Sequence, residues 1–337
     1  MIKVDNLVKT FGPKRAVDGV SFSVQRGEVL GFLGPNGAGK STSMRMITGF
    51  IPPTEGKVAV GGFDMVENPI PAKRLIGYLP ENAPAYADMT VYGFLNFAAE
   101  LRGLRKDARK KAVSRAVEMC FLESVLYQSI DTLSKGYRHR TCFAQSIIHD
   151  PDILVLDEPT DGLDPNQKHE VRNLIRRMGE KKAIIFSTHI LEEVEAVCSR
   201  AIIIDRGKIV ANGTPQELKQ RSDYAGAVSL RVMGVPGDTV RIKLSSIPFA
   251  RKAAIVNEKE NAVWVRVYPQ AGATRNGELA RNVAEISHKE GWKIEELHTE
   301  EGRLDEVFRA ITLPDTAATQ VGRSVPAEPS AKEVVRS

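Results

Sequence analysis

One glycine-rich segment constrains the fold of this chain more than any other feature. Residues 34–41 read Gly-Pro-Asn-Gly-Ala-Gly-Lys-Ser and match the pattern G-x-x-x-x-G-K-[S/T] at every fixed position. The apolar stretch Val29–Leu33 precedes the segment, and a helix-like stretch follows it. A strand, a glycine-rich loop and a helix in this order are the context that a phosphate-binding loop requires. The sequence therefore predicts a cradle for a nucleoside triphosphate.

Each residue type in this loop has a chemical role. Glycines let the backbone curl so that successive N–H groups point at phosphate oxygens, and the following helix adds its positive N-terminal end. We expect Lys40 to reach the β- and γ-phosphates and Ser41 to ligate Mg²⁺. The other predicted nucleotide-binding residues of the loop are Gly34, Pro35, Asn36, Gly37, Ala38 and Gly39. The loop alone leaves kinases, GTPases, motors and transporter ATPases open.

Two carboxylates end a second apolar stretch. Asp157 and Glu158 directly follow Ile153–Leu156, and a buried parallel strand delivers such groups to the carboxyl edge of its sheet, where ligands bind. We expect Asp157 to hold Mg²⁺ through water and Glu158 to polarise the attacking water. The alternative is a strand end capped by solvated acids, which the phosphate-binding loop makes the weaker interpretation.

A histidine and a serine complete the candidate set. His189 follows the apolar stretch Ala183–Phe186 at the same predicted sheet edge, where it is either structural or a hydrogen-bond partner of the γ-phosphate and the attacking water. Ser134 and Gly136 lie where a helix begins. They form either an ordinary helix start or a second anion site, which would close on a nucleotide held by another copy.

The period of the apolar residues changes along the chain. Strand-like alternation up to about Leu79 gives way to helical spacing between Thr90 and Ile148. Three apolar runs then alternate with helical stretches, which predicts βαβ units and a parallel sheet. The expected units are residues 1–222, with a helical subdomain at about 85–150, a small α+β accessory domain at 226–313 and a disordered tail at 314–337.

Composition excludes several classes of protein. The 47 basic residues exceed the 42 acidic ones by only five, which does not by itself indicate nucleic-acid binding. No apolar run approaches the roughly 18 residues of a membrane-spanning helix, and the first residues do not read as a secretory signal. Three widely spaced cysteines fit reduced, buried thiols. We therefore expect a cytoplasmic protein.

Taken together, the motifs resemble those of the ATP-binding subunits of ABC transporters over about residues 1–218. The resemblance implies an α/β P-loop cassette with a parallel sheet core, an N-terminal antiparallel β part and a helical subdomain. It also assigns further residues. Phe11 occupies the place of an aromatic that stacks on adenine, Gly34–Thr42 is similar to the Walker A loop, Leu133–Tyr137 to the signature motif, Gly162–Asp164 to the D-loop, and His189 to the switch histidine. Thr42 and Asp164 thereby join the expected nucleotide-binding residues.

The resemblance also implies a function for this chain. The resemblance implies ATP and Mg²⁺ as ligands, and a head-to-tail dimer with a second copy or a paralogue that sandwiches two ATP molecules. Hydrolysis would drive separate integral membrane permease subunits from the cytoplasmic face of the membrane, and no nucleic acid is expected. The accessory domain, closed by Leu304–Phe308, is similar to that of type-2 exporters, which include multidrug, natrium-extrusion and gliding-motility ATPases.

The chain departs from the family pattern at three positions. Glu81 stands where the Q-loop glutamine is expected, so that an expected Mg²⁺ ligand brings an additional negative charge close to the phosphates. Lys135 and Tyr137 replace a glycine and a glutamine of the signature motif. We expect Lys135 to favour a nearby phosphate.

Two other functions are weighed against transport. ABC ATPases that act on ribosomes or DNA usually carry two cassettes or a long coiled coil, and the sequence has neither. A nucleotide switch without turnover conflicts with the presence of both Glu158 and His189. The basic stretch Arg102–Arg115 fits a solvated helix face or, alternatively, a contact with acidic lipid headgroups. Trp264 and Trp292 are expected in the core of the accessory domain.

Overall fold

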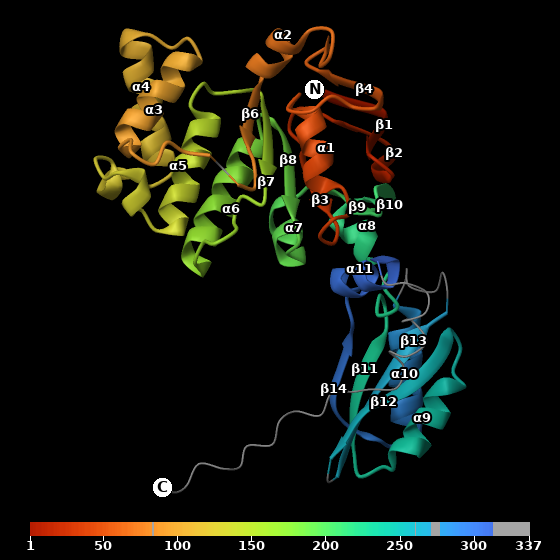
Figure 1. The fold of residues 1–337 in the computed structure, drawn as a ribbon. Coiled ribbons are helices and arrows are strands. Elements are labelled where there is room, and N and C mark those ends of the chain that lie inside the picture. Colours follow the sequence, from red (N-terminus) through yellow and green to blue (C-terminus); the bar gives the residue numbers. More distant parts are fainter. Residues whose placement is uncertain (83, 260, 271–276, 313–337) are drawn as a thin grey trace, which may run out of the picture.

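The computed structural model describes residues 1–312 except 83, 260 and 271–276. The predicted disordered tail at 314–337 lies outside the described residues. The first part of the chain builds two sheets and a group of helices, and the last part builds a separate four-stranded sheet (Figure 1). The arrangement confirms the predicted fold class, an α/β cassette with a parallel core followed by an α+β domain.

An antiparallel sheet forms the N-terminal β part. Its four strands lie in the order β2-β1-β4-β5. Their bounds are β1 (Ile2–Phe11), β2 (Lys14–Val24), β4 (Glu55–Val60) and β5 (Phe63–Asp64). Apolar side chains alternate with exposed ones along β2, where Val20 and Val24 are buried, because one face of this sheet packs on the core and the other meets solvent.

The second sheet positions the site. Its order is β10-β9-β3-β8-β7-β6, and β3, β6, β7, β8 and β9 run parallel to their neighbours while β10 is antiparallel to β9. The bounds are β3 (Val29–Leu33), β6 (Ile76–Leu79), β7 (Ile153–Asp157), β8 (Ala183–Thr188), β9 (Arg200–Asp205) and β10 (Lys208–Gly213). Every residue of β3, β7 and β8 is buried, as expected for strands covered on both faces. The carboxyl ends of these three strands therefore lie side by side.

Helices cover the parallel sheet and form the helical subdomain, seen at the left of Figure 1. Around the sheet lie α1 (Lys40–Ile47), α2 (Pro69–Arg74), α6 (Pro165–Gly179), α7 (Leu191–Val197) and α8 (Pro215–Lys219). The subdomain contains α3 (Val91–Leu101), α4 (Lys106–Met119), α5 (Lys135–Ile147) and the 3-10 turns η1 (Glu123–Val125) and η2 (Ile130–Thr132). Arg105, directly before α4, and Lys106 and Lys110 on the helix are exposed, as on a solvated face. No helix in the described ranges is long and apolar enough to cross a membrane.

The accessory domain has a βαββαβ order. It consists of β11 (Val228–Met233), α9 (Gly237–Ser245), β12 (Ala250–Lys259), β13 (Ala262–Pro269), α10 (Glu278–Lys289) and β14 (Lys293–Thr299), and the sheet order is β12-β13-β11-β14. Val263 and Val265 point into a core shared with both helices. The expectation that Trp264 belongs to this core is wrong, because the alternation of β13 turns its ring to the other face, where Arg231 stacks on it. Trp292 packs against the core.

The last helix, α11 (Leu304–Thr312), returns from the accessory domain to the cassette. It lies between α8 and the accessory sheet (Figure 1). Leu304 is buried in the same apolar cluster as Val194 of α7 and Leu218 of α8. Ser222 donates a hydrogen bond to the carboxylate of Glu306, which fastens the helix to the segment that leads into β11. The accessory domain is thus attached to the cassette at both of its ends.

Candidate functional site

The loop after β3 winds so tightly that two of its positions admit only glycine. A Cβ atom at Gly34 would lie 2.3 Å from the carbonyl oxygen of Ile204. Gly39 has φ = 110°, and a Cβ atom there would lie 2.6 Å from the carbonyl oxygen of Ala16. This close packing against β9 and β2 fixes the path of the loop, and its last residue leads directly into the N-terminus of α1.

Lys40 places its ammonium group inside the loop. Its Nζ donates hydrogen bonds to the carbonyl oxygens of Gly34 at 2.7 Å and Pro35 at 3.4 Å. Burial lowers the pKa of Lys40, while the negative charges of Glu158, Asp157 and Glu81 act against that shift. The cation therefore lies between two backbone carbonyl oxygens on one side and carboxylates on the other, as recognition of a phosphate next to a metal ion requires.

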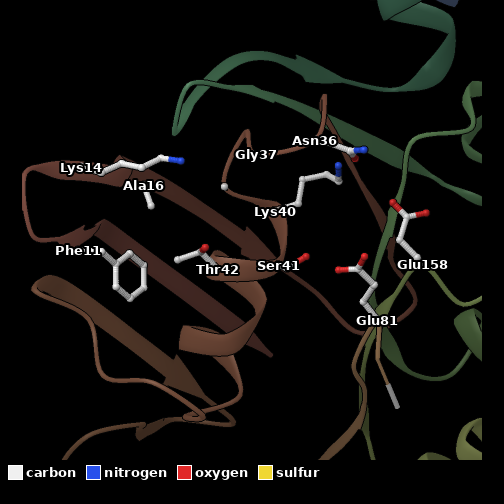
Figure 2. Close-up of a pocket in the computed structure, with 11 residues that line it drawn as sticks. Phe11, Lys14, Ala16, Asn36, Gly37, Lys40, Ser41, Thr42, Glu81 and Glu158 are labelled. Atoms are coloured by element: carbon white, nitrogen blue, oxygen red, sulfur yellow. The ribbon is translucent and has the colours of Figure 1, made fainter. Parts of the chain in front are cut away.

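A cavity of about 380 Å³ opens above the loop. Figure 2 shows the ring of Phe11 on one side, the loop in the middle, and the carboxylates of Glu81 and Glu158 on the other side. The cavity is lined by Phe11, Lys14, Ala16, Asn36, Gly37, Gly39, Lys40, Ser41, Thr42, Glu81 and Glu158. A nucleotide has its base at one end, its phosphates in the middle and a bound metal ion beside them. The aromatic ring, the cation with its neighbouring hydroxyls, and the carboxylates of the cavity follow the same order. Sequence reasoning missed Lys14 and Ala16 on β2, because neither belongs to a motif, although both follow Phe11 closely along the chain.

Asp157 and Glu158 end β7 but face different neighbours. Asp157 is 1% exposed and accepts a hydrogen bond of 2.5 Å from the hydroxyl of Ser187. The backbone N–H of Glu158 donates to the same hydroxyl at 3.0 Å. Glu158 adopts φ = 51°, a left-handed conformation that is uncommon for a residue with a side chain. This bend turns its carboxylate away from Asp157 and into the cavity, a strained geometry typical of functional sites.

Glu158 and His189 form a pair at the sheet edge. His189 Nδ1 lies 2.9 Å from Glu158 Oε2, and the imidazole side chain is 56% exposed while the carboxylate is 12% exposed. Burial raises the pKa of Glu158, whereas the neighbouring His189 and Lys40 lower it. A half-buried carboxylate with a raised pKa and a hydrogen-bonded imidazole has the properties of a general base held in place by a partner.

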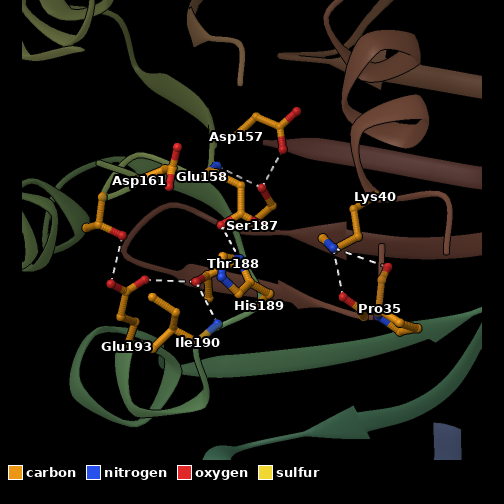
Figure 3. A network of polar contacts seen from close by, with 12 residues as sticks. Pro35, Lys40, Asp157, Glu158, Asp161, Ser187, Thr188, His189, Ile190 and Glu193 are labelled. Carbon is orange, nitrogen blue, oxygen red and sulfur yellow. Dashed lines mark hydrogen bonds and ion pairs between the residues drawn. The ribbon is translucent and has the colours of Figure 1, made fainter. Parts of the chain in front are cut away.

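A third buried acid, Glu193, supports this arrangement and was not found from the sequence. Its Oε1 accepts a hydrogen bond of 2.7 Å from Thr160, and its Oε2 accepts one of 2.8 Å from Thr188. The network is visible in Figure 3. Glu193 thereby ties the loop after Glu158 to the end of β8, directly before His189. In the sequence Glu193 looks like one of several acids on a solvated helix. The only signals of the network are the hydroxyl residues Thr160, after β7, and Thr188, at the end of β8.

Three of the expected nucleotide-binding residues lie elsewhere. Ser134 caps α5 and accepts a hydrogen bond from the Tyr137 N–H at 3.4 Å, and Gly136 lies in the first turn of that helix. Asp164 caps α6 and accepts from the Gln167 N–H at 2.9 Å. None of them lines the cavity that contains Lys40. A single chain therefore brings together the loop, Phe11, Glu81 and the β7 acids, but not the signature segment.

The donor set at the cavity fits a metal ion that arrives with a nucleotide. Ser41 and Glu81 line the cavity, and Asp157 is buried beside it. Within the described ranges, no group of three or more His, Cys, Asp or Glu side chains is close enough to hold a metal ion. Mg²⁺ is commonly held in this way, by one or two carboxylates together with phosphate oxygens and water. Ser41, Asp157 and Glu81 are thus the residues that would hold Mg²⁺.

Strand β3 of the parallel sheet leads into the phosphate-binding loop, and strand β7, which ends in an acid, lies two places away in the sheet. This arrangement defines the P-loop class of nucleoside-triphosphate-binding proteins. Within that class, residues 17–161 match the family model described as ABC transporter. The linearmycin resistance ATP-binding protein LnrL of Bacillus subtilis is 35% identical over 236 residues, which cover 70% of this chain and 76% of that protein. The chain belongs to the ABC transporter ATP-binding family.

Two further comparisons agree with this assignment. The "Probable multidrug ABC transporter ATP-binding protein YbhF" of Escherichia coli is 40% identical over 223 residues. That match covers 66% of this chain but only 38% of the relative, so the chain spans well under half of YbhF. A solved structure of an "ATP binding subunit of ABC transporter" superposes with a TM-score of 0.61 at 27% identity and covers 66% of this chain and 92% of that one.

Proposed function

We propose that this chain is the ATP-hydrolysing motor subunit of an ABC exporter. The observation that carries the proposal is Glu158, whose carboxylate faces the cavity that contains Lys40 and pairs with His189 at 2.9 Å. ATP would lie with its adenine on Phe11 and its phosphates against residues 34–42. Mg²⁺, when bound with the nucleotide, supplies charge neutralisation at the β- and γ-phosphates.

The residues of the chain have separate roles in this proposal. Lys40 binds the β- and γ-phosphate oxygens through its ammonium group. Glu158 orients the attacking water and accepts its proton at a carboxylate oxygen, because its raised pKa makes it a better base than an ordinary glutamate. His189 holds the Glu158 carboxylate through Nδ1 and turns its other ring nitrogen to the γ-phosphate.

The site is completed by a second cassette, either another copy or a paralogue. Ser134 and Gly136 lie at the open N-terminus of α5, away from the cavity of their own chain. A helix N-terminus with a capping serine attracts an anion. In a head-to-tail dimer this terminus binds the γ-phosphate held by the partner, and Asp164 lies at the dimer seam.

The work of the dimer is transferred to separate integral membrane permease subunits. Residues 1–222 form the motor unit and 226–313 the accessory domain, and the assembly is peripheral on the cytoplasmic face of the membrane. The names of relatives support export, since they include "Nod factor export ATP-binding protein I" of Ralstonia nicotianae, 37% identical over 219 residues. We expect no nucleic acid as a partner.

The test is the effect of Mg-ATP on the oligomeric state of Glu158→Gln, measured by size exclusion with light scattering. The amide keeps the shape of the site but cannot take a proton. We therefore expect hydrolysis to fall by at least about 100-fold and a dimer to accumulate. The matched control is Lys40→Ala in the Glu158→Gln chain, which should stay monomeric because it binds ATP poorly. If wild type releases no phosphate and Glu158→Gln stays monomeric with ATP bound, a motor function is contradicted.

A further inference from the structure

Lys135 occupies an electrostatically unfavourable position. It is the first residue of α5, where the positive end of the helix dipole disfavours a cation, and no acidic residue lies in that first turn. Its Nζ lies 2.7 Å from Asp161 Oδ2. Because the two side chains are 69% and 53% exposed, the ion pair adds little to the stability of the fold. Its significance therefore lies in which two segments it joins.

Asp161 belongs to the turn that begins at the proposed catalytic base. Its backbone N–H donates to the carbonyl oxygen of Glu158 at 3.1 Å, and the N–H of Leu163 donates to that of Thr160 at 3.3 Å. The strained φ of Glu158 is the first step of this turn. A displacement of Asp161 is therefore transmitted through one backbone hydrogen bond to Glu158.

The signature segment packs directly on this turn. Gly162 has φ = 71°, and a Cβ atom there would lie 2.6 Å from Cδ of Lys135, so the lysine stem lies flat against the glycine. A Cβ atom on Gly136 would lie 2.7 Å from Oε1 of Gln167. The start of α5 is therefore packed against both the turn after Glu158 and the first turn of α6.

We propose that Lys135 is a positioning residue that couples the two ATP sites of the dimer. It would do so by linking the signature segment, which contacts the ATP held by the partner, to the turn that carries Glu158 of its own site. This inference rests on the proposed function. It adds to the expectation that Lys135 favours a nearby phosphate.

The chemistry of the link is a competition between two anions for one ammonium group. In the structure Lys135 pairs with Asp161, and this pairing lowers the pKa of that carboxyl. The phosphates of the partner's ATP approach the same helix end and attract the same ammonium. Transfer of Lys135 to the phosphate releases Asp161 and changes the position of Glu158. Occupation of one site thus sets the geometry of the base at the other, a reciprocal coupling.

The first experiment compares steady-state hydrolysis by the full chain in wild type, Lys135→Met, Asp161→Asn and the charge swap Lys135→Asp with Asp161→Lys. Each single variant should lower kcat by about fivefold and bring the Hill coefficient for ATP close to that of independent sites. ATP binding to the cavity of the monomeric chain, measured by direct titration, should not change, because Lys135 does not line that cavity. Lys135→Arg should restore most of both losses, whereas the swap should not, because a carboxylate at position 135 repels the partner's phosphates. Lys111→Met, an exposed lysine on α4, is the matched control.

A second measurement does not depend on turnover. Hydrogen exchange at the Asp161 and Leu163 amides of the nucleotide-free chain should accelerate in Lys135→Met and Asp161→Asn, return towards wild type in the swap, and stay unchanged in Lys111→Met. Unchanged exchange in both single variants would overturn the inference even if the chain is an active motor. Failure of the motor function itself is recognised separately, by the absence of phosphate release from wild type.

Discussion

Glu158 combines a left-handed backbone with a half-buried carboxylate, and these features make its proton affinity measurable in the reaction. Burial raises the pKa of Glu158, and a base works only when it is ionised. As pH falls, kcat should therefore decline at a pH above that expected for an ordinary glutamate. His189 lowers the same pKa, so His189→Gln should move the decline to still higher pH. A pH profile of kcat checks this, and a shift to lower pH would contradict it.

Glu81 is the residue at which this cavity differs from the expected pattern, and its charge predicts two effects of opposite sign. A carboxylate binds Mg²⁺ better than an amide does, but it repels phosphate. Glu81→Gln should therefore raise the Mg²⁺ concentration needed for half-maximal hydrolysis by about threefold or more. It should also tighten the binding of ATP without Mg²⁺. Titrations with and without the metal measure both, and Glu67→Gln, an exposed acid outside the cavity, is the control.

At the scale of elements, the accessory domain depends on α11 for its attachment. Leu304 is 1% exposed within the apolar cluster of the cassette. Replacing a buried leucine by alanine leaves a cavity, so Leu304→Ala should cost about 2–5 kcal/mol of unfolding free energy. Ile242→Ala, at a residue that is 60% exposed on α9, should change that free energy by less than about 0.5 kcal/mol. Urea unfolding of both variants provides the comparison, and equal stabilities would contradict the packing described for α11.

The elements that could be predicted are those with strong periodicity or a motif. Strands β3, β7 and β8 are continuous apolar runs, and the alternation of β13 is equally clear. Helix α9 and strand β12 were not predicted. Strand β12 is an edge strand that contains lysine, asparagine and glutamate, which are poor strand formers, and α9 is short with only three buried residues. Without these two elements the βαββαβ order of the accessory domain could not be recognised.

At the scale of the whole molecule, the residues predicted from the sequence and the residues that line the cavity make up the same part of the nucleotide site, the part that one chain supplies. The motifs predicted which residues would converge around Lys40. The antiparallel sheet brings Phe11 to the cavity, and the parallel sheet with its loops brings Ser41, Glu81 and Glu158. The Glu193 network could not be predicted, because its three members, Thr160 after β7, Thr188 of β8 and Glu193 of α7, are brought together only by tertiary packing. Ser134 would likewise lie opposite a nucleotide only in a dimer with a second chain. Its contact with that nucleotide is therefore part of the proposed function.

The two attachments of the accessory domain also make the cassette a host for grafted domains. The chain leaves the cassette after α8 and returns at Gly302, where a Cβ atom would lie 1.9 Å from the carbonyl oxygen of Lys219. Entry and exit are thus in van der Waals contact, as they are in proteins that tolerate inserted domains. A foreign domain with adjacent termini, such as a ligand-binding reporter, is therefore best spliced between Arg221 and Arg303, with α11 retained to cover the apolar surface of α8.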